Sequence, residues 1–334
     1  MSLLRLPTLS LVCAPSASQL DLSTNTIGGH YEDDGYDSDG DEQTKFVADP
    51  EGVQAIAGAL RVNGVLTKVT LAKKQLGGEG TKAICEALEQ NTTLKELDIS
   101  SKKFGKSNIG GTAGVKHVAK MLGVNGGLTV ANLLGNQLDA ESAKMLAEVA
   151  KQKGISLCGI KRDQATADFS DKRLQPPDAI LLASDLSQAV VTGALTKLSL
   201  AKIELGEEGT KAICEALERN TTLKELDISG HLNLSRPPSI RGSAGAKHVA
   251  KMLGVNNSLT KLSLANNELG EEGTKAICEA LEQNKSLKEL DISGDRLGNR
   301  GSNIGASAGA KHVAKMLGVN GALTTVWTSA HELS

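Results

Sequence analysis

The chain has 334 residues, a formal net charge of −2 and 40% hydrophobic residues, and only 2% of its residues are aromatic. This composition indicates a globular protein with a core of Leu, Ile, Val and Ala, without the strong basic excess of a nucleic-acid-binding protein. No apolar run approaches the roughly 20 residues that a membrane-spanning helix needs, so no membrane span is predicted.

The N-terminal 65 residues predict divergent repeat units. Leucine spacing within residues 1–18 favours the remnant of a first strand over a signal peptide, which this segment resembles only weakly. Residues 19–64 predict a further unit, with a helix from Pro50 to Leu60. Between its strand and its helix, His30 to Glu42 (HYEDDGYDSDGDE) is predicted to be an inserted acidic loop.

The rest of the chain repeats itself. A two-unit copy occupies residues 66–127, 195–258 and 259–322, residues 128–194 form a divergent middle, and residues 323–334 begin an incomplete last unit. Self-similarity at a fixed period is the signature of a repeat architecture. We therefore expect a single solenoid over the whole chain. Because neither end shows an atypical polar capping unit, both ends look unfinished.

Each unit predicts a strand, a turn and a helix. In the last copy, Leu262 and Leu264 are two residues apart and therefore lie on one side of a strand. Small and apolar residues recur every three or four positions from Gly273 to Leu281, as on one stripe of a helix. Parallel strands stack about 4.8 Å apart, whereas helices need roughly 8–10 Å. A stack of such units must therefore bend into a horseshoe with strands on the concave face.

The pattern LxxLxLxxNxL, matched by residues 259–269 (LTKLSLANNEL), is followed by a helix in a unit of about 28 residues. It resembles the leucine-rich repeat of the ribonuclease-inhibitor type, and the resemblance covers nearly the whole chain. It implies an α/β leucine-rich-repeat solenoid, with parallel strands on the concave face and helices on the convex face. It also implies partner binding by the concave face and the adjoining loop edge.

The first candidate site is the concave face, where positions between the buried leucines alternate Lys and Glu. The partner-binding candidates there are Lys197, Glu225, Asp227, Lys261, Glu289 and Asp291. If the units stack in register, Lys and Glu pair across strands, each pair contributing roughly 0.2–1 kcal/mol. The face is either a charged groove for a protein partner or a set of pairs that satisfy each other. Its mixed sign argues against nucleic acid.

The second candidate site is a set of long strand-to-helix loops, rich in Gly and Ser, at residues 102–114, 230–245 and 294–309. Their cationic candidates are Lys103, Lys106, Arg236, Arg241, Arg296 and Arg300. Loops on a rigid scaffold often carry binding residues, although ordinary surface loops of variable length are the alternative.

Other motifs predict no metal, cofactor or catalytic site. Asp37, Asp39 and Asp41 alternate as calcium ligands do, but Glu42 follows directly and breaks the EF-hand register. Gly105-Lys106-Ser107 resembles the end of a phosphate loop without its first glycine. The remaining recurrent residues are interpreted as helix-surface histidines (His117, His248, His312) and as helix-to-strand turn asparagines (Asn91, Asn220, Asn256, Asn284).

The cysteines indicate the compartment. Cys85, Cys214 and Cys278 occupy one position of the segment KAICEAL, whole repeats apart and so too distant for disulfides. No close CxxC pair suggests a metal site. We interpret them as small helix residues in a reducing, cytoplasmic compartment.

The sequence therefore predicts a non-enzymatic, cytoplasmic protein-interaction scaffold, with no cofactor and a protein partner of unidentified nature. Two alternatives stay open. One is a GTPase-activating protein resembling the activator of the Ran GTPase, which has the same repeat type. The other is a set of sensor repeats from an innate-immune-type receptor.

Overall fold

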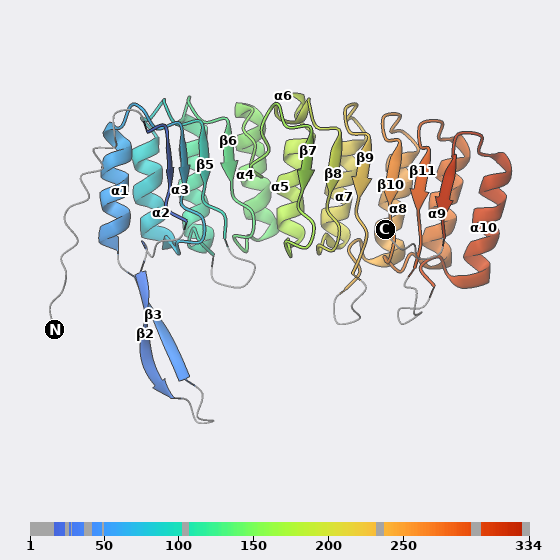
Figure 1. The fold of residues 1–334 in the computed structure, drawn as a ribbon, viewed down its shortest axis with the longest axis horizontal. Coiled ribbons are helices and arrows are strands. Elements are labelled where there is room, and N and C mark those ends of the chain that lie inside the picture. Colours follow the sequence, from blue (N-terminus) through green and yellow to red (C-terminus); the bar gives the residue numbers. More distant parts are fainter. Residues whose placement is uncertain are drawn as a thin grey trace. The chain divides into compact units, whose positions relative to one another are not determined.

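The computed structural model describes residues 17–23, 27, 29–36, 42–48, 50–101, 107–231, 237–294 and 302–328. These fall into two compact units, Met1–Gly159 (unit 1) and Ile160–Ser334 (unit 2). Within each unit, short parallel strands form one layer and helices form the other (Figure 1). The predicted α/β leucine-rich-repeat solenoid architecture is therefore confirmed.

Unit 1 contains a four-stranded parallel sheet in the order β1-β4-β5-β6. Its strands are β1 (Gln19–Asp21), β4 (Lys68–Thr70), β5 (Glu96–Asp98) and β6 (Val130–Asn132). Its helices are α1 (Pro50–Val62), α2 (Gly77–Leu88), α3 (Gly111–Val124) and α4 (Ala140–Lys153). The predicted helix at Pro50 is confirmed.

Beyond α4, residues 155–164 form no strand. Two isolated bridges connect this segment to β6, Val130 with Ser156 and Asn132 with Cys158. The backbone turns into the left-handed region at Gly159, with φ 78°, which interrupts extended pairing. The segment therefore pairs with β6 at single residues and forms no strand.

The inserted acidic segment also differs in secondary structure from the predicted loop. Strands β2 (Gly29–Tyr36) and β3 (Glu42–Ala48) form a separate antiparallel sheet, in which Tyr31 pairs with Phe46 and Glu32 with Lys45. The expected loop at residues 30–42 is therefore largely a strand of a hairpin. Thr, Phe and Val in β3 have high strand propensity, which the acidic composition of the preceding run concealed. Asp37, Asp39 and Asp41 lie outside the described residues.

Unit 2 contains a six-stranded parallel sheet in the order β12-β11-β10-β9-β8-β7. Its strands are β7 (Thr166–Asp168), β8 (Lys197–Ser199), β9 (Glu225–Asp227), β10 (Lys261–Ser263), β11 (Glu289–Asp291) and β12 (Thr325–Trp327). Its helices are α5 (Pro176–Leu186), α6 (Ala189–Thr192), α7 (Gly206–Leu217), α8 (Gly242–Leu253), α9 (Gly270–Gln283) and α10 (Ala306–Val319). Lys197 pairs with Glu225 and Glu225 with Lys261, so equivalent residues lie side by side.

The core lies between the two layers and follows the predicted periodicities. Leu262 and Leu264 of the strand segment are fully buried, and so is Leu281 of α9. The middle residue of each strand from β7 to β11 is buried while its neighbours are more exposed. A single repeat cannot cover this apolar side, so adjacent repeats bury it for each other.

Buried asparagines join each repeat to the one before it. In the turn after α8, the Asn256 side-chain amide donates hydrogen bonds to the carbonyl oxygens of Leu217 (2.7 Å) and Asn220 (3.2 Å). Its Oδ1 accepts hydrogen bonds from the backbone N–H groups of Ser258 (3.0 Å) and Leu259 (2.9 Å). The same arrangement recurs at Asn91, Asn125, Asn284 and Asn320.

A second row of asparagines lies at the strand-to-helix turns. Asn303 Oδ1 accepts hydrogen bonds from the backbone N–H groups of Asn267 (2.8 Å) and Leu269 (3.4 Å) in the preceding repeat. Asn108 and Asn136 form the corresponding contact in unit 1. Each repeat is therefore linked to its neighbour at both ends of the strand.

The turn asparagines generate a stability prediction with a control in the next residue. Asn256→Ala should lower the free energy of unfolding by about 2–4 kcal/mol, because buried backbone groups lose their hydrogen-bond partners. Asn257 is exposed and donates only to the Val255 carbonyl, so Asn257→Ala should stay within about 0.5 kcal/mol. Urea unfolding followed by circular dichroism measures both. Equal losses of stability in the two variants would contradict a stabilising role for the buried turn asparagines.

Candidate functional site

The open face of unit 2 is the side of strands β7 to β12 that is turned away from the helices. The first and third residues of each strand lie on it, because the middle residue of β7 to β11 is buried. Strand pairing keeps these residues in straight rows across the sheet. The six candidates predicted for the concave face all belong to these rows.

Lysine and glutamate pair along the first row. The Lys197 ammonium lies 3.1 Å from a carboxylate oxygen of Glu225, and Lys261 lies 2.8 Å from Glu289. Unit 1 has the equivalent pair of Lys68 and Glu96 at 3.5 Å. The predicted in-register pairing is therefore confirmed. These side chains are partly exposed, so each pair contributes roughly 0–1 kcal/mol and mainly orders the surface.

Aspartates on alternate strands occupy the next row. Oδ1 of Asp227 accepts a hydrogen bond from the Ser229 N–H (2.9 Å), and Oδ1 of Asp291 accepts one from the Ser293 N–H (2.9 Å). Asp168 makes the same bond to the Ser170 N–H (2.8 Å). The hydrogen bonds from Ser170 hold the pKa of Asp168 below its usual value, which keeps that carboxylate charged. Each carboxylate is thus fixed in one orientation by its own turn.

Two residues of this face were missed by the sequence reasoning. Asp168 could have been found, because ADFS occupies the place of LDIS in the other repeats. Trp327, the one tryptophan of the chain, lies on β12 beside Asp291, and the Lys261 ammonium is 5.6 Å from its ring centroid. A cation near an indole face is attracted to the ring, so Trp327 belongs to the polar surface of the sheet.

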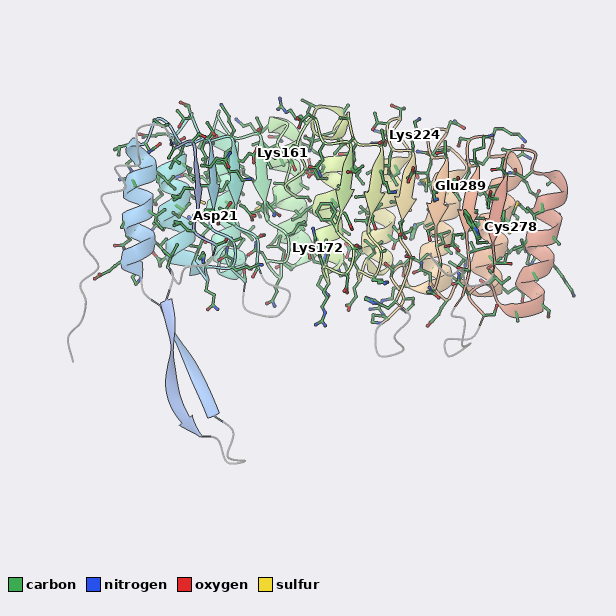
Figure 2. All side chains as sticks on the ribbon, viewed as in Figure 1. Asp21, Lys161, Lys172, Lys224, Cys278 and Glu289 are labelled. Atoms are coloured by element: carbon green, nitrogen blue, oxygen red, sulfur yellow. The ribbon has the colours of Figure 1, made fainter. Side chains whose placement is uncertain are left out.

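Two further lysines lie at one edge of the strand layer. Figure 2 shows Lys224 at the edge formed by the helix-to-strand turns and Glu289 within the strand layer. Lys224 and Lys288 precede β9 and β11, and both side chains are exposed. Among the described residues, neither lysine is within ion-pair distance of a carboxylate.

Of the six loop candidates, the structure describes only Arg241. Lys103, Lys106, Arg236, Arg296 and Arg300 lie outside the described residues. Arg241 is exposed and occupies the residue before α8 with φ 61°, where the other copies have Gly110 (φ 79°) and Gly305 (φ 81°). An L-residue in this region costs roughly 1 kcal/mol relative to glycine. The structure therefore places Arg241 at the loop edge and leaves its predicted grouping with the other loop cations untested.

The recurrent histidines lie on separate helices, as predicted. His248 Nε2 is 3.8 Å from a Glu207 carboxylate oxygen, and His312 is 3.8 Å from Glu271, so each forms a local pair between neighbouring repeats. In the part of the chain that the structure describes, no group of His, Cys, Asp and Glu could hold a metal ion. Within the same residues, no helix combines the length and apolar character needed to cross a membrane.

Cys85, Cys214 and Cys278 form no disulfide, as the repeat pattern predicted, and these three and Cys158 are all buried. Burial raises the pKa of Cys85 and of Cys278 to about 12, because the thiolate would lose its hydration. The same cause raises the pKa of Cys214 far above its usual value. These thiols are therefore packing residues without nucleophilic character.

A family model described as Leucine Rich repeat matches residues 255–278, which contain β10 and the first part of α9. The matched segment is one leucine-rich repeat, and its sequence recurs in the other copies within the chain. The repeats support a role in protein interaction.

Residues of this chain are similar to a curated relative and to solved structures. The chain is 27% identical over 160 residues to "NACHT, LRR and PYD domains-containing protein 5" of Bos taurus, a match covering 48% of this chain and 13% of that relative. The C-terminal domain of Caenorhabditis elegans tropomodulin is 14% identical, with 60% of this chain and 90% of that chain covered and a TM-score of 0.29. A Bacteroides fragilis protein is 14% identical over 87% of this chain and 88% of its own, with a TM-score of 0.32.

The buried thiols generate a second prediction. In a Cys13→Ser background, a disulfide reagent at pH 8 should leave the native protein unlabelled for hours, because Cys85, Cys158, Cys214 and Cys278 are all buried. Addition of concentrated guanidinium chloride should expose all of these thiols at once. Fast labelling of Cys214 or Cys278 under native conditions would show that the helices do not pack as described.

Proposed function

We propose that this leucine-rich repeat protein is a non-enzymatic scaffold that binds a protein partner through the open face of unit 2. The observation that carries the proposal is a solvent-facing sheet surface with fixed charged rows and the chain's one tryptophan, Trp327, on it. The buried thiols of Cys85, Cys214 and Cys278, which form no disulfide, support a reducing, cytoplasmic setting.

Preorganisation makes this face suitable for binding. The ion pairs of Lys197 and Lys261 and the serine hydrogen bonds of Asp227 and Asp291 already restrict the side chains. A partner therefore has less side-chain entropy to remove on binding. Trp327 supplies the type of residue that most often dominates interface energy.

The long loops are proposed as a second contact region. Arg241, at the start of α8, is exposed and held at φ 61° in a turn that favours glycine. Backbone strain of this kind is retained where the surroundings enforce it, and it is frequent in functional loops. The other loop cations, Lys103, Lys106, Arg236, Arg296 and Arg300, are included in this proposal from their sequence positions.

A second candidate function is that of sensor repeats in an innate-immune-type receptor. The matched relative is named for NACHT, LRR and PYD domains, and the match spans 13% of its length. A transcript that encodes a nucleotide-binding module in frame with these repeats would favour this function. The GTPase-activator alternative stays a prediction, and the rate of GTP hydrolysis by Ran with and without the chain tests it.

The scaffold proposal predicts a face-specific loss of binding. The double variant Lys197→Glu and Lys261→Glu should lose protein partners that the wild-type chain captures, because it places new carboxylates beside Glu225 and Glu289. Affinity capture from cell extract, quantified by mass spectrometry, measures the loss.

The matched control is Lys211→Glu with Lys275→Glu, which reverses two exposed lysines on α7 and α9 in the same repeats. The control should keep the partners, and circular dichroism should show both variants folded. Identical partner lists for the two variants would contradict binding at the open face. Arg241→Glu in the same assay separates a contribution of the loop edge.

A further inference from the structure

The dipeptide Asn-Gly occurs three times in the chain, each time in a helix-to-strand turn, at Asn63-Gly64, Asn125-Gly126 and Asn320-Gly321. An asparagine side chain before glycine loses ammonia readily, because glycine has no Cβ to shield its backbone nitrogen from the neighbouring amide carbon. All three glycines are exposed. The local sequence therefore makes the three sites chemically similar, and the fold has to distinguish them.

Two of these asparagines are held by the preceding repeat. Asn125 is 2% exposed and Asn320 is 8% exposed. The Asn125 amide nitrogen donates hydrogen bonds to the carbonyl oxygens of Leu88 (2.6 Å) and Asn91 (2.8 Å), and Asn320 makes the equivalent pair of bonds. A buried side chain that is hydrogen-bonded at both ends reacts with its backbone only after local opening. These two sites are therefore protected in the native chain.

Asn63 lacks this protection. It is half-buried, and its neighbours Val62 and Val65 are 83% and 44% exposed. Its Oδ1 accepts hydrogen bonds from the backbone N–H groups of Val65 (2.9 Å) and Leu66 (2.7 Å), as in the other two turns. Within the described part of the chain, however, its amide nitrogen donates no hydrogen bond. The Oδ1 contacts keep the side chain folded back beside Gly64 and polarise its carbonyl, which favours attack.

We propose that Asn63 is a site of spontaneous deamidation in the folded chain. The Gly64 backbone nitrogen forms a bond to Cγ of Asn63, the Cγ–Nδ2 bond breaks, and the amide leaves as ammonia with the proton of the Gly64 N–H. The product is a five-membered succinimide, which one water molecule opens. Water addition at Cγ gives aspartate, and addition at the main-chain carbonyl carbon gives isoaspartate. The reaction needs no oxidant and no cofactor.

Isoaspartate at this position changes a junction between repeats. The main-chain carbonyl oxygen of Asn63 accepts hydrogen bonds from Asn91 Nδ2 (3.2 Å) and Thr93 Oγ1 (3.4 Å) in the next repeat. In isoaspartate this carbonyl becomes a free carboxylate, and the main chain runs through Cγ with one additional methylene. The turn after α1 can then no longer hold the geometry that joins it to the α2 repeat. Deamidation should therefore loosen α1 first.

The experiment compares the three sites within one chain. The full chain is incubated at 37 °C and mildly alkaline pH, both in native buffer and in concentrated guanidinium chloride, and is then cleaved with trypsin. The three sites fall in different peptides, residues 62–68, 121–144 and 316–334. Mass spectrometry measures the conversion of each asparagine with time, and isoaspartyl methyltransferase with a labelled methyl donor detects the isoaspartate.

In native buffer Asn63 should convert at least about tenfold faster than Asn125 and Asn320, because those two sites must first break buried hydrogen bonds. In guanidinium chloride all three should convert at similar rates. Similar native rates at the three sites would overturn the inference. So would an unchanged Asn63 after a time in which the denatured chain converts, or denatured rates that reproduce the native ratio.

Gly64→Ala is the variant that tests the route. A Cβ at Gly64 would meet no atom within 4 Å, and the backbone there is outside the positive-φ region, so the fold should be kept. The methyl group should slow conversion of Asn63 at least about fivefold by shielding the backbone nitrogen. Gly126→Ala, which also meets no atom within 4 Å, is the matched control and should leave the Asn63 rate unchanged. An unchanged Asn63 rate in Gly64→Ala would overturn the succinimide route.

Hydrogen exchange reports the effect on the junction. After equal incubation, α1 should exchange faster in the wild-type chain than in Gly64→Ala, while α9 should exchange equally in both. Equal exchange of α1 in the two incubated proteins, with Asn63 converted in only one, would overturn the loosening of α1.

Discussion

The structure depends on buried asparagine side chains that connect each repeat to its neighbour. A short strand and one helix cannot cover their own apolar side, and adjacent repeats bury it together. The turns between them still carry backbone N–H and C=O groups that are removed from water. Asn256 and Asn303 satisfy such groups at opposite ends of the repeat. Repeat stacking is thereby fixed to one register, and the rows on the open face follow from that register.

The parallel arrangement also explains the charge distribution. All repeat helices of a unit run in the same direction, so their dipoles add, with positive ends at the strand-to-helix turns. Glu207 and Glu208 in the first turn of α7, and Glu271 and Glu272 in the first turn of α9, complement those ends. Cations such as Lys224 and Lys288 lie at the opposite edge. The fold therefore favours acidic residues at the strand-to-helix turns.

Much of this fold could be predicted from the sequence, because strand and helix periodicities are local. Leucines spaced by two fixed the buried side of the strands, and repetition fixed the lysine and glutamate rows. The second asparagine row was harder to find, because an inserted loop separates Asn303 from its strand and Leu297 falls nearer the expected position. The β2–β3 hairpin was missed because the residues of β3 with high strand propensity directly follow an acidic segment that was interpreted as a loop. Trp327 was missed because only strand pairing places it beside Asp291.

The loop cations show what a repeat pattern in the sequence cannot predict. Arg241 replaces a glycine of the other copies, so its position before α8 could be inferred, but the cost of φ 61° could not. The partner's identity is also absent from a repeat pattern, because the same scaffold presents different surface residues in different proteins.

Hydrogen exchange in unit 2 tests the stacked register most directly. The backbone N–H groups of Leu200, Ile228 and Leu264 donate hydrogen bonds to backbone carbonyl oxygens of the next strand. The acceptors are Asp227, Ser263 and Asp291 respectively, at 2.7, 3.1 and 2.7 Å. Exchange measured by NMR or by mass spectrometry of the intact native chain should be slow for all three amides, with one common opening free energy. Exchange of these amides at the rate of an unstructured peptide would contradict the stacked parallel repeats.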